Sequence, residues 1–72
     1  MPSEVTALLA RIDAEYSAAR IALHGLASGT ARHEVINASM GRAQVASERL
    51  IEVIGTERAL PLIVKAMDKG AS

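Results

Sequence analysis

The chain has no cysteine, no phenylalanine and no tryptophan, and Tyr16 is its only aromatic residue. The absence of cysteine excludes a disulfide framework and any cysteine-based zinc or redox site. A chain with one aromatic side chain also lacks the platform on which nucleic-acid bases stack. Apolar runs are short, such as residues 7–10, so no segment approaches the ~20 apolar residues that span a bilayer.

The chain has no excess of charge of either sign, because 8 Lys and Arg balance 8 Asp and Glu. A balanced charge removes the general electrostatic attraction to nucleic acid or to an anionic membrane. It also removes the long-range repulsion between copies, which favours self-association. The sequence begins without the basic stretch and apolar core of a signal peptide, so we expect a cytoplasmic protein with no membrane partner.

Half of the 72 residues are apolar, which is too many for a disordered tail. The length allows a single domain, residues 1–72, and leaves no room for the usual catalytic scaffold with a substrate cleft. No alternation of apolar and polar residues persists, and alanine is frequent, so we expect an all-α fold without strands.

Two glycine–threonine pairs divide the sequence, Gly29 with Thr30 and Gly55 with Thr56. A glycine can end a helix in a left-handed conformation, and the following threonine can cap the next helix. Ser3 is placed to cap the first helix in the same way. The predicted helices therefore cover residues 4–27, 31–54 and 57–69. Pro61 lies in the first turns of the third helix and is interpreted as a bend that lets this helix dock.

The first two helices carry apolar residues in alternating steps of four and three, which is the pattern of a helix-packing seam. When the chain folds back near Gly29, bulky residues of one seam face small residues of the other, and interdigitated packing of this kind leaves few voids. The pattern predicts an antiparallel helical hairpin. Its expected seam residues are Val5, Leu9, Ile12, Tyr16, Ala19, Leu23 and Leu26 in the first helix, and Ile36, Met40, Ala43, Ser47, Leu50 and Ile54 in the second.

A two-helix hairpin of this length cannot bury enough apolar surface to be stable alone. The third helix is too short to cover both arms, and further apolar residues lie away from the seam. We therefore expect a homodimer with a core resembling a four-helix bundle, with contacts to another protein as a further option. The residues expected at the oligomer or partner interface are Ala14, Ile21, Val35, Ala46, Val53, Ile63 and Met67.

Candidate chemical groups are few, and no catalytic, cofactor-binding or metal-binding residue is predicted. His24, His33 and Glu34 could approach one another near the hairpin turn, but a zinc or iron site needs three or four converging ligands in a shaped pocket. Glu48 and Glu52 are four residues apart, which on a solvated helix face is a mildly repulsive pair. No base is arranged for a nucleophile, and neither phosphate-binding glycine motif occurs.

Residues 36–50 resemble the core of a helix-turn-helix motif, with Gly41 at the turn. The apolar seam runs through Gly41, however, and this favours one continuous helix. A glycine there is explained if a neighbouring helix approaches closely. Arg42 and Arg49 are seven residues apart, on one face of the helix, and could contact nucleic acid or an acidic partner. We favour a solvated face partly neutralised by nearby glutamates.

The sequence thus favours a non-catalytic helical interaction module that acts through self-association and protein–protein contacts, as a small regulator, adaptor or assembly element in a bacterial-type cytosol. The alternative is a small DNA-binding transcriptional regulator of the helix-turn-helix type. Gly41 separates the two hypotheses, because the first needs a helical residue there and the second needs a turn.

Overall fold

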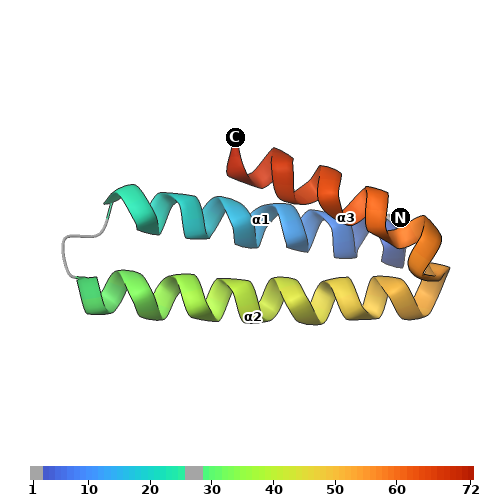
Figure 1. Ribbon diagram of the computed structural model, residues 1–72, viewed down its shortest axis with the longest axis horizontal. Helices are drawn as coiled ribbons and strands as arrows, with labels where there is room; N and C mark the ends of the chain where they lie inside the picture. Colours follow the sequence, from blue (N-terminus) through green and yellow to red (C-terminus); the bar gives the residue numbers. More distant parts are fainter. Residues whose placement is uncertain (1–2, 26–28) are drawn as a thin grey trace.

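The computed structural model describes residues 3–25 and 29–72, and nearly all of them are helical. The three helices are α1 (Glu4–Gly25), α2 (Gly29–Ile54) and α3 (Thr56–Ala71). Figure 1 shows α1 and α2 side by side and antiparallel, with α3 turning back to lie along α1. The described residues contain no strand. The prediction of an all-α fold with three helices, the first two packed as a hairpin, is confirmed for the single chain.

The first helix begins where the sequence predicted. The backbone N–H of Thr6 donates to Ser3 Oγ at 3.1 Å, so Ser3 satisfies one of the N–H groups that a helix leaves unpaired at its start. The start of the second helix differs from the predicted residue 31, because α2 begins at Gly29. Thr30 therefore lies within the helix, not in front of it. The predicted end of the first helix at Ala27 and the seam position Leu26 lie outside the described residues.

A single residue, Gly55, forms the corner between α2 and α3. Its φ of 85° lies in the region that only glycine enters easily, as the sequence predicted. Its N–H donates to the carbonyl of Ile51, and its own carbonyl accepts from the N–H of Ala59. The expected threonine cap is wrong: Gly55 is the N-cap, no side chain caps α3, and Thr56 is already helical. The α3 helix continues through Pro61.

The core lies where the three helices meet, and half of its buried cluster is alanine. Its buried cluster combines bulky and small apolar residues from all three helices: Ile12, Ala46, Leu50, Ala59, Ile63 and Ala66. Several predicted seam residues pack against this cluster: Val5, Leu9, Tyr16 and Ile54. In this cluster, bulky Ile12 of α1 and Leu50 of α2 pack together with small Ala46, which lets bulky and small side chains fill the space between the helices.

Leu23 is a correction to the predicted seam, because 52% of it is exposed. Its neighbour Ala22 is buried in its place. Leu23 follows Tyr16 by seven residues, which places it on the side of α1 that faces α3, where Tyr16 lies beside Gly70. The carbonyl of Gly70, near the end of α3, accepts hydrogen bonds from Ser17 Oγ and Arg20 Nε, both at 3.3 Å. The third helix therefore ends beside residues 17–20 and does not reach the Leu23 side chain.

The contact between α3 and α1 depends on the missing side chain of Gly70. A Cβ at this position would collide with the carbonyl oxygen of Asp13 and would lie 2.7 Å from the Cβ of Tyr16. Gly70 is accordingly buried, and Lys69 beside it pairs with Asp13 at 3.8 Å. The backbone of α3 thus lies directly against the backbone of α1 at this point.

The α2 helix runs unbroken through Gly41, as the favoured hypothesis predicted. No described helix of the same chain provides the close approach expected at this glycine, however. A Cβ at Gly41 would meet no atom within 4 Å, so no neighbouring helix of the same chain requires a glycine there. Close approach occurs at Gly70, not at Gly41.

Candidate interaction surface

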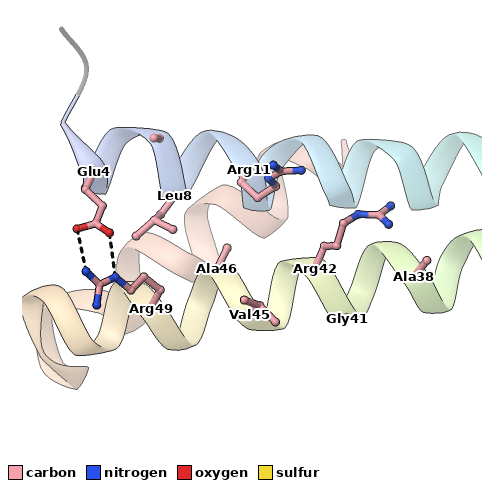
Figure 2. Close-up of a pocket in the computed structure, with 10 residues that line it drawn as sticks. Glu4, Leu8, Arg11, Ala38, Gly41, Arg42, Val45, Ala46 and Arg49 are labelled. Atoms are coloured by element: carbon pink, nitrogen blue, oxygen red, sulfur yellow. Dashed lines mark hydrogen bonds and ion pairs between the residues drawn. The ribbon is translucent and has the colours of Figure 1, made fainter.

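A shallow groove of about 680 Å³ runs between α1 and α2. None of its lining residues comes from α3. Its floor and walls are mostly small or apolar, with charged side chains at the rim, as Figure 2 shows. The lining residues are Glu4, Ala7, Leu8 and Arg11 from α1, and Ala38, Gly41, Arg42, Val45, Ala46 and Arg49 from α2.

Four of the residues predicted at an interface extend this groove along the two helices. Ala14 and Ile21 follow Ala7 at intervals of seven, and helical geometry places such residues on one face. On α2, Val35 precedes Arg42 by seven residues and Val53 follows Arg49 by four, and both intervals also keep residues on one helix face. All four are exposed, Ile21 by 62%. We use the name open face for the groove together with these four residues: Ala14, Ile21, Val35 and Val53.

The other three predicted interface residues lie inside the chain's own fold. Ala46 and Ile63 are buried in the core, and Met67 packs against it. Their apolar character is therefore accounted for by contacts among the three helices. Only Ala46 also borders the groove, at its floor.

A buried carboxylate anchors two arginines of the groove. Glu15 is 5% exposed, and its Oε2 accepts hydrogen bonds from Arg42 Nε at 2.7 Å and from Arg11 Nη1 at 3.2 Å. Arg42 also donates to the hydroxyl of buried Ser39 at 3.4 Å. A buried charge is tolerated when it is paired and hydrogen-bonded in this way. The network joins α1 to α2 beneath the rim of the groove.

The hydrogen bond from Arg42 is the largest influence on the pKa of Glu15 and lowers it. Burial acts in the opposite direction, and the bond from Arg11 lowers the pKa further. The net pKa lies below that of an ordinary glutamate, so Glu15 stays ionised. The sequence alone does not single out Glu15, because a charged residue between apolar seam positions is typical of a solvated side chain.

A second ion-pair cluster closes one end of the groove. Arg49 Nε donates to Glu4 Oε2 at 2.8 Å, and Arg49 Nη1 donates to Glu52 Oε2 at 3.1 Å. Figure 2 shows Glu4 and Arg49 facing each other across this end. Both predicted contact arginines, Arg42 and Arg49, therefore line the groove and are already paired with glutamates of the same chain. Both are half exposed.

The histidines and glutamates weighed for metal or acid–base chemistry all lie on the surface. His24, His33 and Glu34 are exposed, and so are Glu48 and Glu52. Within residues 3–25 and 29–72, no group of three or more His, Asp or Glu side chains is placed to hold a metal ion. The arrangement offers a surface for binding, and its polar groups are mostly bonded to one another.

The helix-turn-helix alternative required a turn at Gly41, and the continuous α2 helix does not provide it. Comparisons of the chain with protein-family models, with curated proteins and with solved structures give no match. Among the described helices, none combines the length and apolar character needed to cross a bilayer.

Proposed function

We propose that the protein is a non-catalytic helical interaction module that self-associates through the open face. In the proposed homodimer, α1 and α2 of two copies form a core like a four-helix bundle, and each α3 lies outside it. The observation that carries this proposal is the apolar groove between α1 and α2, which α3 leaves uncovered. A small cytoplasmic regulator, adaptor or assembly element would use such a surface.

The balance between buried and exposed apolar side chains supports self-association. In the described residues, the buried apolar set contains five alanines and only three bulky side chains, Ile12, Leu50 and Ile63. Seven bulky apolar side chains are exposed: Ile21, Leu23, Val35, Val45, Val53, Leu60 and Val64. Burying one such side chain stabilises a protein by about 1.5–3 kcal/mol. Four of the seven, Ile21, Val35, Val45 and Val53, belong to the open face, so a second copy bound there would add them to the apolar core.

The polar groups of the open face support binding in preference to catalysis. Glu15 is held ionised by Arg42 and Arg11, and Glu4 is paired with Arg49. A general acid or base needs a pKa near neutrality and contact with a substrate, whereas the pKa of Glu15 is lowered. The small side chains around the groove suit the close approach of another helix.

Sedimentation equilibrium over a wide range of protein concentration tests the proposal. The unaltered chain is expected to form a dimer. Val45→Lys places a charge in the groove and should raise the dissociation constant by about tenfold or more. Val64→Lys is the matched control, because Val64 is also exposed but belongs to α3; its dissociation constant should stay close to that of the unaltered chain.

Three results would contradict the proposal. The unaltered chain could remain monomeric at every concentration, which would remove self-association altogether. Val64→Lys could dissociate the dimer while Val45→Lys does not, which would move the interface to α3. Both variants could weaken the dimer equally, which would show that added charge, not the open face, decides the outcome. Circular dichroism of each variant confirms that it retains its helices.

A further inference from the structure

We propose that the two copies pack their α2 helices antiparallel with Val45 on the two-fold axis, so that Arg42 of each copy pairs with Glu48 of the other. This inference rests on the proposed self-association and specifies its geometry. It starts from Val45, which is 69% exposed, more than any other bulky apolar side chain in the described residues. In a dimer with two-fold symmetry, a residue on the axis contacts its own counterpart, so this position buries both valines together.

The axis position fixes which other residues face each other. In an antiparallel pair of identical helices, residues equally far before and after the axial residue are opposite. Arg42 lies three residues before Val45 and Glu48 three residues after it. These spacings keep both on the same helix face as Val45. Two ion pairs between Arg42 and Glu48 therefore form symmetrically about the axis.

Arg42 and Glu48 can each form this intermolecular ion pair without losing a bond within the described residues. Glu48 is exposed and forms no ion pair with any described residue. Arg42 bonds to Glu15 through Nε and to Ser39 through Nη2. A guanidinium has five N–H donors, so Nη1 of Arg42 remains to reach a carboxylate of the second copy. The pairing adds a partner for Glu48 without breaking the network that holds Glu15.

Side-chain sizes agree with the same register. Gly41 lies four residues before Val45 and Arg49 four residues after it, so the residue without a side chain faces one of the longest. Ala38 lies seven residues before Val45 and faces Glu52 in the same way. A Cβ at Gly41 would meet no atom of the described residues within 4 Å. The register explains the glycine by the space that Arg49 of the second copy needs.

Cysteine cross-linking tests the axis directly, because the chain has no cysteine of its own. Val45→Cys should form a disulfide-linked dimer rapidly under mild oxidation, since a disulfide requires Cα atoms about 4.4–6.8 Å apart. Gln44→Cys is the matched control: the neighbouring residue is exposed but points about 100° away around the helix, and it should cross-link far more slowly. Equal rates for the two variants, or a faster rate for Gln44→Cys, would overturn the register.

Charge reversal tests the ion pair independently. Glu48→Lys should raise the dissociation constant of the dimer by about tenfold or more, because it places two positive charges opposite two arginines. Glu34→Lys makes the same change of charge on the same helix, two heptads away, and should alter the dissociation constant by less than about threefold. Glu48 has no ion pair with residues 3–25 or 29–72, so helicity and unfolding of the single chain should change little in either variant.

The outcomes separate the two proposals. If the unaltered chain is monomeric, the proposed function fails and the register fails with it. If the unaltered chain forms a dimer that Val45→Lys disrupts, but Glu48→Lys binds as tightly as Glu34→Lys, self-association through the open face stands and this register is overturned. Rapid cross-linking through Val45→Cys combined with selective loss of affinity in Glu48→Lys supports both.

Discussion

The two faces of the α1–α2 hairpin differ in the surroundings of the glycine that lies at each of them, Gly70 of α3 and Gly41 of α2. On the face that α3 covers, Gly70 lies against the backbone of α1, and any side chain there would collide with Asp13 and Tyr16. On the open face, Gly41 has empty space around it. The first face is a finished contact within one chain. The second has the small residues of a helix contact but no helix upon it, which is why we propose a second copy there.

The bonds across the two faces differ as well. The covered face joins α3 to α1 through the carbonyl of Gly70, which accepts from Ser17 and Arg20. The open face is tied by ion pairs between α1 and α2 that involve Glu15 and Glu4. On the covered face, Ser17 and Arg20 are thus bonded to α3. On the open face, Arg42 and Arg49 remain half exposed. The covered face is therefore closed by direct contact and hydrogen bonds with α3, whereas the charged pairs of the open face border a surface that no other described helix of the chain covers.

The largest expected effect comes from adding a side chain to the covered face. Gly70→Ala should lower the free energy of unfolding by about 1–3 kcal/mol, because overpacking forces the backbones of α3 and α1 apart. Urea denaturation measures the change. Ala71→Gly is the control. Ala71 is the next residue along the chain and is exposed, so this substitution alters only helix propensity. A more stable Gly70→Ala variant would show that the two helices are not in backbone contact.

A second prediction concerns pH and the carboxylate beneath the open face. Because Arg42 lowers the pKa of Glu15 in the folded chain, the ionised form is favoured by folding. The stability that this provides is present above the ordinary pKa of a glutamate, about 4.3, and is lost as the pH falls through the lower, folded-state value. Glu15→Gln should therefore be less stable than the unaltered chain at neutral pH, and the gap should narrow in acid.

Urea denaturation at a series of pH values measures this gap, and Glu34→Gln serves as the control. Glu34 is exposed, so its replacement should leave the pH dependence of unfolding close to that of the unaltered chain. A difference between Glu15→Gln and the unaltered chain that stays constant from neutral to acidic pH would show that the charge of Glu15 does not matter to folding. The substitution would then act only through packing.

Much of the fold could be predicted because helix boundaries have local causes. Ser3 caps α1 through a bond to a residue three positions on, and Gly55 turns the chain through its own φ. The apolar pattern likewise located buried Ile12 and Leu50. Each of these features depends on a few neighbouring residues or on the period of one helix, so a single sequence contains the information.

The features that could not be predicted depend on the position of a distant helix. Leu23 fits the apolar pattern, yet it is exposed because α3 ends before it. Glu15 breaks the pattern, yet it is buried because Arg42 reaches it from α2. Gly70 lies just beyond the predicted end of the third helix at residue 69, and its close contact with α1 cannot be predicted without the position of α3. Of the groove-lining residues, Ala46, Arg42 and Arg49 were predicted to make contacts, but Val45 and Gly41 were not.

The smallest expected effect comes from the glycine of the open face and has the opposite sign to that of Gly70. At protein concentrations where the chain is monomeric, Gly41→Ala should raise the free energy of unfolding by about 0.5–1 kcal/mol, because alanine is the better helix former and its Cβ meets no atom. Ala38→Gly is the reverse substitution at an exposed position of the same helix, so it should lower the free energy of unfolding by a similar amount.

A loss of stability in Gly41→Ala would mean that the space beside Gly41 is already filled within one chain, and the contrast between the two faces would disappear. A gain would show that this glycine lowers the stability of the single chain and that the space beside it is open, as the contrast between the two faces requires.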